Sequence, residues 1–116
     1  MLLVETIAFN LEKLGFRVLK AFDGESGLKQ ALELKPQLVI LDVMLPHLSG
    51  WEVCRTLRAA SPYGRELPIL MLTARSETRD RQKGLDAGVT EYLLKPFSML
   101  ELMKRVQDLL GASNET

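Results

Sequence analysis

Short apolar runs alternate along this chain with segments of helical periodicity, and this alternation limits the possible folds more than any other feature. The apolar runs cover residues 16–21, 38–42, 67–72 and 91–94. Apolar residues recur at helical spacing within 3–14, 27–34, 51–60, 77–87 and 100–110. Helices that alternate with buried strands are typical of an α/β protein with a parallel sheet and right-handed crossovers. We therefore expect one α/β domain, which the length of 116 residues also suits.

The charge balance and the cysteine count exclude several classes of function. Basic and acidic residues both number 15, so the net charge is zero and no electrostatic footprint for nucleic acid or an anionic membrane is expected. No apolar run approaches the roughly 18 residues of a membrane span, and no leader is recognisable. The single cysteine, Cys54, cannot form an internal disulfide, so we expect a reducing, cytoplasmic setting.

Three polar residues close three of the expected strands. Asp42 ends the run LVILD, Thr73 ends ILMLT, and Lys95 ends EYLLK. In open parallel sheets, sites lie beyond the carboxyl ends of the strands, so these side chains are expected at one edge. A carboxylate there can attack a phosphoryl group, a hydroxyl can donate a hydrogen bond to it, and a lysine can neutralise its charge. A single such residue is more often a turn or cap residue, but the three together favour a site.

Four stretches carry a resemblance to a known family over essentially the whole chain. They are LVILDVMLPHLSGWEVCRTLR, LPILMLTARSE, GLDAGVTEYLLKPF and ELMKRVQDLL. In order and spacing they resemble the receiver domain of two-component response regulators, most of all the type joined to a winged-helix transcription regulator. The resemblance implies a flavodoxin-like, CheY-like doubly wound parallel sheet with strand order 2-1-3-4-5. It also implies a receiver domain over residues 1–111 and the start of a linker at 112–116.

The resemblance implies a role for each residue at the strand ends. Asp42 is expected to be the phosphoacceptor, which takes a phosphoryl group from a sensor histidine kinase. Thr73 and Lys95 are expected to bind that group, and the backbone N–H of Ala74 to contact it. Tyr92 is expected to be the switch aromatic that turns inward with Thr73. The chain would be a signalling domain rather than an enzyme, assisting only its own phosphorylation and dephosphorylation.

The amino terminus departs from the family pattern. Receivers begin with an apolar strand that ends in two acidic residues, which hold Mg²⁺. Here Leu3, Ile7 and Leu11 make one helical face from the start, so the first strand and its acidic pair are expected to be absent. The alternative is that MLLVE is itself that strand, with Glu5 at its end. The magnesium site expected from the family is therefore incomplete, with Asp42 and the backbone carbonyl of Met44 as its remaining ligands.

Two further expectations concern partners. Arg81, Glu91, Glu101 and Arg105 match positions that form charged pairs across a dimer face in similar receivers, although they could equally be solvated helix charges. A homodimer through this face or by strand exchange is expected, with DNA contacted only through an output domain absent from this chain. Because the acidic pair is absent, a non-phosphorylated pseudo-receiver that acts as a protein-interaction module remains the alternative function.

Overall fold

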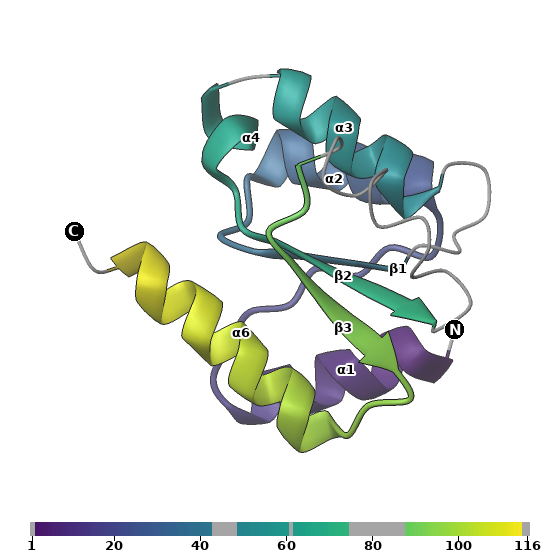
Figure 1. Ribbon diagram of the computed structural model, residues 1–116, viewed down its shortest axis with the longest axis vertical. Coiled ribbons are helices and arrows are strands. Elements are labelled where there is room, and N and C mark those ends of the chain that lie inside the picture. The colour runs from purple at the N-terminus through teal and green to yellow at the C-terminus, as the bar shows by residue number, and fades with distance from the viewer. Residues whose placement is uncertain (1, 43–48, 61, 75–87, 115–116) are drawn as a thin grey trace.

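The structure of this protein, a computed structural model, describes residues 2–42, 49–60, 62–74 and 88–114. Its elements, in chain order, are α1 (Leu2–Lys13), α2 (Gly24–Leu34), β1 (Val39–Asp42), α3 (Gly50–Ala60), α4 (Pro62–Glu66), β2 (Ile69–Ala74), β3 (Glu91–Lys95) and α6 (Met99–Asn114). Two helices, α1 and α2, precede β1, and two more, α3 and α4, lie between β1 and β2, so helix and strand do not alternate throughout as predicted (Figure 1). None of the helices described is long and apolar enough to cross a membrane.

The described strands form one parallel sheet in the order β1-β2-β3. Helices α1 and α6 cover one face of this sheet, and α2 and α3 cover the other (Figure 1). Because β2 is central and covered on both faces, its residues from Ile69 to Thr73 are all at most 2% exposed. The predicted doubly wound α/β architecture is confirmed.

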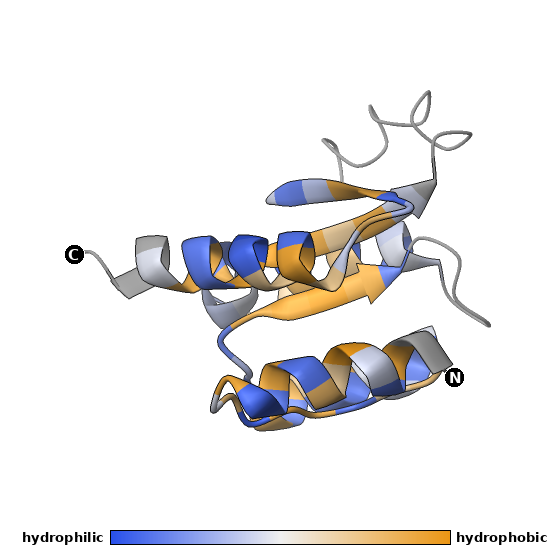
Figure 2. Cartoon of the chain, turned by 90° about the horizontal axis from the view of Figure 1, so that it is seen from below, coloured by the Kyte–Doolittle hydropathy of each residue, from blue (hydrophilic) through white to orange (hydrophobic). Residues whose placement is uncertain are grey.

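Each face of the sheet has its own apolar cluster. The first packs Val53, Cys54 and Leu57 of α3 against the sheet, together with Ala31 of α2. The second packs α1 and α6 against the opposite face, through Ile7, Leu11, Leu70, Leu72, Leu93, Leu102, Met103 and Val106. Figure 2 shows the resulting pattern, with an apolar sheet between helices whose polar residues face outward. Alternate strand residues enter opposite clusters, as the two-residue period of a strand requires.

The structure corrects one expected strand. Residues 16–21 form no strand, although their composition predicted one. Helix α1 begins at Leu2, so residues 2–5 are helical and the alternative that MLLVE forms the first strand is wrong. Among the residues that the structure describes, no strand pairs with the segment 16–21, so its backbone lacks the hydrogen-bonded ladder that a strand requires.

The remaining differences concern element bounds. Helix α2 begins at Gly24, ahead of the expected start, because the Asp23 side chain caps it by accepting a bond from the Ser26 N–H at 2.7 Å. The short helix α4 (Pro62–Glu66) was not predicted. Helix α6 continues to Asn114, past the expected end of the last helix. The helix predicted for 77–87 lies outside the described residues.

Candidate functional site

The three polar residues predicted at the strand ends lie at one edge of the sheet. Asp42, the last residue of β1, is in register with Leu72 of β2, which immediately precedes Thr73. Ala74, the residue after Thr73 in β2, is in register with Lys95, the last residue of β3. Asp42, Thr73 and Lys95 therefore lie within two residue positions of one another along the strands. They lie on the side to which the arrowheads point (Figure 1).

An ion pair joins the two outer strands of the described sheet. The Lys95 Nζ atom donates a hydrogen bond to Asp42 Oδ2 at 2.5 Å. Because β2 lies between β1 and β3, the lysine side chain must reach past the central strand to meet the carboxylate. The Asp42 side chain is 16% exposed and that of Lys95 is 31% exposed, so both remain accessible from solvent. The peptide bond from Lys95 to Pro96 is cis.

Thr73 and Tyr92 lie on the face of the sheet that α3 covers. Thr73 is 2% exposed and shares its strand face with Met71, whose side chain belongs to the cluster beneath α3. Tyr92 is in register with Met71 and packs against the same cluster. Its hydroxyl accepts a hydrogen bond from Trp51 Nε1 of α3 at 3.3 Å. The predicted switch pair therefore shares one face, with the tyrosine held by a tryptophan.

The amino end of α3 lies against the carboxyl end of β1. A Cβ atom added at Gly50 would lie 2.5 Å from the Asp42 carbonyl oxygen, so only glycine permits this approach. Ser49 caps the helix, since its Oγ accepts a hydrogen bond from the Glu52 N–H at 3.2 Å. The positive end of the helix dipole thus lies beside Asp42, where it favours added negative charge.

The metal ligands expected from the family are not assembled in the part of the chain that the structure describes. No group of three or more His, Cys, Asp or Glu residues lies close enough there to hold a metal ion. Asp42 is present at the edge, but its carboxylate is engaged by Lys95. Met44 lies outside the described residues, and the contact predicted for the Ala74 N–H stays a prediction. The described donors therefore do not fit Mg²⁺ by themselves.

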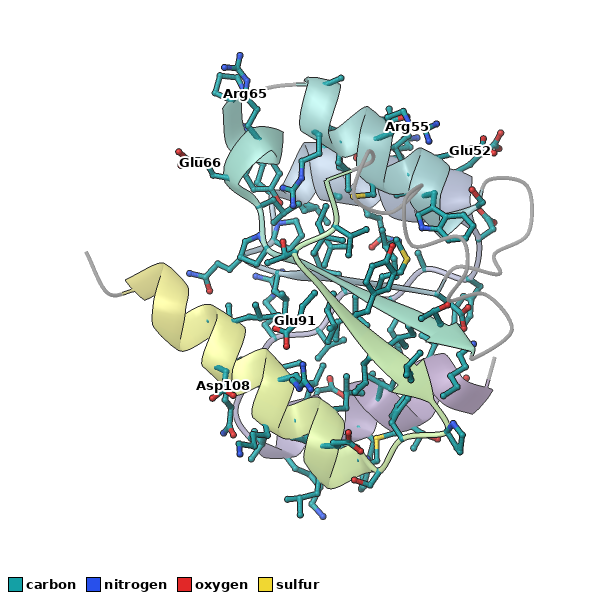
Figure 3. All side chains as sticks on the ribbon, viewed as in Figure 1. Glu52, Arg55, Arg65, Glu66, Glu91 and Asp108 are labelled. Atoms are coloured by element: carbon teal, nitrogen blue, oxygen red, sulfur yellow. The ribbon has the colours of Figure 1, made fainter. Side chains whose placement is uncertain are left out.

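Two of the residues predicted to form a dimer face pair within the chain. Arg105 Nη1 of α6 donates to Glu91 Oε1 at the start of β3, and Figure 3 shows Glu91 beside α6. Glu101 is exposed in the first turn of α6, and Arg81 lies outside the described residues. Within the chain, the Glu91–Arg105 ion pair links α6 to the start of β3.

Sequence reasoning missed two residues that organise the surroundings of the site. Trp51 packs against the first apolar cluster, and its Nε1 also donates a hydrogen bond to the Tyr92 hydroxyl. Arg58 received no role, yet its guanidinium donates to the carbonyls of Gly64, Leu67 and Gly88. An arginine in the last turn of a helix has no sequence signal for such contacts, because their acceptors are backbone atoms from distant segments.

Comparison with known proteins identifies the family. The model of the response regulator receiver domain matches residues 1–107. The alkaline phosphatase synthesis transcriptional regulatory protein PhoP of Bacillus subtilis is 46% identical over 111 residues, which are 96% of this chain and 45% of the relative. The response regulator MprA of Mycobacterium leprae is 44% identical over 91% of this chain and 45% of its own length. The chain therefore spans about half the length of these relatives.

Solved structures agree with this assignment. The chemotaxis response regulator CheY4 of Vibrio cholerae superposes with a TM-score of 0.87 at 30% identity, over 94% of this chain and 90% of that one. The receiver domain of the sensor histidine kinase PA1611 from Pseudomonas aeruginosa, described with magnesium in its active-site cleft, has a TM-score of 0.80 at 34% identity, over 94% and 86%. This chain belongs to the receiver domain family of two-component response regulators.

Proposed function

We propose that Asp42 is the phosphoacceptor of this receiver domain. The observation that carries the proposal is the 2.5 Å contact between Asp42 Oδ2 and Lys95 Nζ at the carboxyl edge of the sheet. It places a solvent-accessible carboxylate beside a cation, which is what a nucleophile for an anionic group requires. The positive end of the α3 dipole, which lies beside Asp42, also attracts an anionic group to this edge of the sheet.

The transfer is a displacement at phosphorus. A carboxylate oxygen of Asp42 attacks the phosphoryl group of a phosphohistidine on a sensor kinase, the P–N bond breaks, and an acyl phosphate forms. The histidine takes the bonding electron pair and a proton. Lys95, which already contacts the carboxylate, then neutralises the charge on the new phosphoryl oxygens. Lys95 thus exchanges one anionic partner for another without leaving its strand.

Thr73 and Tyr92 couple this event to the rest of the domain. A phosphoryl group on Asp42 attracts the Thr73 hydroxyl, whose residue lies one row further along the neighbouring strand. Movement of Thr73 alters the space beside Tyr92 on the shared face, where Trp51 holds the tyrosine hydroxyl. The phosphoryl group on Asp42 thereby biases an equilibrium between two arrangements of the face that carries Thr73 and Tyr92.

The described residues do not assemble a set of ligands for Mg²⁺, so the proposed transfer is assigned to Asp42 and Lys95. Receiver domains bind this ion, as the magnesium-bound relative illustrates. The same observation supports a second candidate function, a non-phosphorylated pseudo-receiver that acts as a protein-interaction module. The two candidates differ in one measurable property, which is phosphoryl uptake at Asp42.

The wider context of the domain follows from its relatives. Because the chain spans about half of the transcriptional regulators it matches, we propose that residues 1–111 form the receiver and that 112–116 lead to a DNA-binding output domain. A sensor histidine kinase is the proposed partner, and the cytoplasm the proposed location. A homodimer would use the face that carries Glu91, Glu101 and Arg105, with the Glu91–Arg105 pair exchanging partners between subunits.

The test is phosphoryl uptake measured by intact mass. The purified chain is incubated with acetyl phosphate and Mg²⁺, alongside Asp42→Asn and the control Asp108→Asn, which changes an exposed carboxylate of α6 far from the site (Figure 3). We expect one phosphoryl group on the unchanged chain and on the control, and none on Asp42→Asn. Uptake by Asp42→Asn would refute the site, whereas no uptake by any chain would favour the interaction module.

A further inference from the structure

A hydrogen bond between Trp51 and Tyr92 joins α3 to β3 on one face of the sheet. Trp51 Nε1 donates to the Tyr92 hydroxyl at 3.3 Å, across 41 positions of the chain. Both side chains are partly buried and pack against the apolar cluster beneath α3. An indole nitrogen can only donate a hydrogen bond, whereas a phenol hydroxyl can also accept one. The bond therefore ties the far end of the tyrosine side chain to α3.

The first turn of α3 holds the backbone of Trp51 in place. Ser49 caps this turn, since its Oγ accepts a backbone hydrogen bond at 3.2 Å. A Cβ atom added at Gly50 would lie 2.5 Å from the Asp42 carbonyl oxygen, so the backbone just before Trp51 lies directly against the end of β1. The indole therefore donates from a backbone position that is fixed relative to the sheet.

The backbone that carries Tyr92 is also held. Tyr92 lies within β3, which pairs with β2 along its length. Just before it, the Arg58 guanidinium donates to the Gly88 carbonyl at 2.7 Å and to Thr90 Oγ1 at 3.1 Å. The Thr90 N–H donates to the Ile69 carbonyl at 3.0 Å. Since both backbones are held, the bond breaks by rotation of a side chain and not by movement of α3 or β3.

The hydrogen bond belongs to the arrangement that precedes phosphoryl transfer. It coexists with the 2.5 Å contact between Lys95 Nζ and the Asp42 carboxylate, which transfer to Asp42 would break. In the other arrangement of the proposed switch, Tyr92 turns as Thr73 moves. Because side-chain rotamers are about 120° apart, this turn carries the hydroxyl out of hydrogen-bond reach of the indole. An interaction present in only one of two states stabilises that state and lowers the population of the other.

We propose that Trp51 is a positioning residue of the switch: its indole N–H holds Tyr92 in the arrangement that precedes transfer, and so limits phosphorylation of Asp42. This inference rests on the proposed function of Asp42 and Tyr92. One hydrogen bond changes an equilibrium constant by a net factor of roughly two to ten. Loss of the indole donor therefore raises the population of the other arrangement, and with it the rate of phosphoryl uptake, by about that factor.

The first test follows the bond by NMR and needs no phosphoryl transfer. The chain has one tryptophan, so its indole N–H gives a single cross-peak. Tyr92→Phe removes the acceptor and should shift this cross-peak and speed its hydrogen exchange roughly two- to tenfold. Tyr63→Phe is the matched control, because the Tyr63 hydroxyl donates to the Pro36 carbonyl, and it should leave the cross-peak unchanged.

The tyrosine rings supply the reciprocal measurement. The chain has two tyrosines, so ¹³C-labelled rings give signals that the same two substitutions assign. Trp51→Phe, which keeps an aromatic ring in the cluster, should shift the ring signals of Tyr92 and leave those of Tyr63 in place. An indole cross-peak that does not respond to Tyr92→Phe, or Tyr92 signals that do not respond to Trp51→Phe, would overturn the inference.

The second test measures the limit on phosphorylation. The rate of phosphoryl uptake from acetyl phosphate with Mg²⁺ is followed by intact mass for the unchanged chain, Trp51→Phe, Tyr92→Phe and the double variant. Trp51→Phe should take up the phosphoryl group roughly two to ten times faster than the unchanged chain. The double variant should match Tyr92→Phe alone, because the indole then has no hydroxyl to hold, whereas a packing defect would add its effect in both backgrounds.

The outcomes separate this inference from the proposed function. Equal uptake by Trp51→Phe and the unchanged chain, or additive effects in the double variant, would overturn the inference while the proposed function stands. If no chain takes up a phosphoryl group, the proposed function is wrong and the limit on phosphorylation is wrong with it. The NMR shifts still decide in that case whether Trp51 positions Tyr92.

Discussion

Arg58 is expected to contribute more to stability than any other charged side chain that the structure describes. It projects from the last turn of α3 and contacts α4 and the segments that lead into β2 and β3. Its guanidinium donates to the carbonyls of Gly64 at 2.8 Å, Leu67 at 2.5 Å and Gly88 at 2.7 Å. It also donates to Thr90 Oγ1 at 3.1 Å, and that oxygen accepts from the Ile69 N–H at 2.9 Å. Arg58 thus joins α3 and α4 to the starts of β2 and β3.

The loss on substitution can be estimated from these contacts. Arg58→Ala leaves three carbonyls without this donor, and an unsatisfied buried polar group costs roughly 1–3 kcal/mol. Arg58 is only partly buried, so water can replace some of the bonds, and we expect a loss of about 3 kcal/mol. Arg58→Lys keeps the charge but replaces a planar fork by a single ammonium group. It should therefore recover less than half of that loss.

The assay is urea unfolding at pH 7, followed by circular dichroism, which gives the free energy of unfolding for each chain. Arg55→Ala is the matched control, because Arg55 lies on the same helix and is exposed (Figure 3). Its effect should stay within about 0.5 kcal/mol. If Arg58→Lys were as stable as the unchanged chain, the positive charge alone would explain the stabilisation by Arg58. The planar shape of the guanidinium would then contribute nothing.

Two other predictions use the same unfolding assay. Gly50→Ala should cost about 1–3 kcal/mol, because the added Cβ would lie 2.5 Å from the Asp42 carbonyl oxygen and 2.8 Å from Met71 Sδ. Gly111→Ala, where no atom lies within 4 Å, should cost nothing, and equal losses would contradict the steric reason. Burial raises the pKa of the Cys54 thiol, against the lesser opposing effect of the Arg58 and Arg55 charges. As the pH rises, the thiol therefore ionises in the unfolded chain before it does in the folded one. Its contribution to stability is complete below about pH 8.5 and is lost as the pH rises further. The free energy of unfolding of Cys54→Ala should therefore fall less from pH 8 to 10 than that of the unchanged chain, and an equal fall would show that Cys54 is not its cause.

Local pattern was enough to predict most of the elements and the position of the candidate site. The apolar run before Asp42 predicted a buried strand, and the same reasoning placed Thr73 and Lys95 at the edge where the structure has them. This works because a parallel sheet brings all its carboxyl ends to one side, whatever the contacts between side chains. The helical periodicity of residues 3–14 likewise predicted the helix that the structure has as α1.

Only the tertiary structure decided the outcome for residues 16–21. Their composition suits a strand, but a strand exists through hydrogen bonds to a neighbour, and no strand that the structure describes pairs with them. The contacts of Arg58 and of Trp51 with Tyr92 were also beyond sequence reasoning, because they join segments that are distant along the chain. Periodicity is a property of neighbouring residues and can be read locally. Backbone pairing and long-range hydrogen bonds depend on which partners the fold brings within reach.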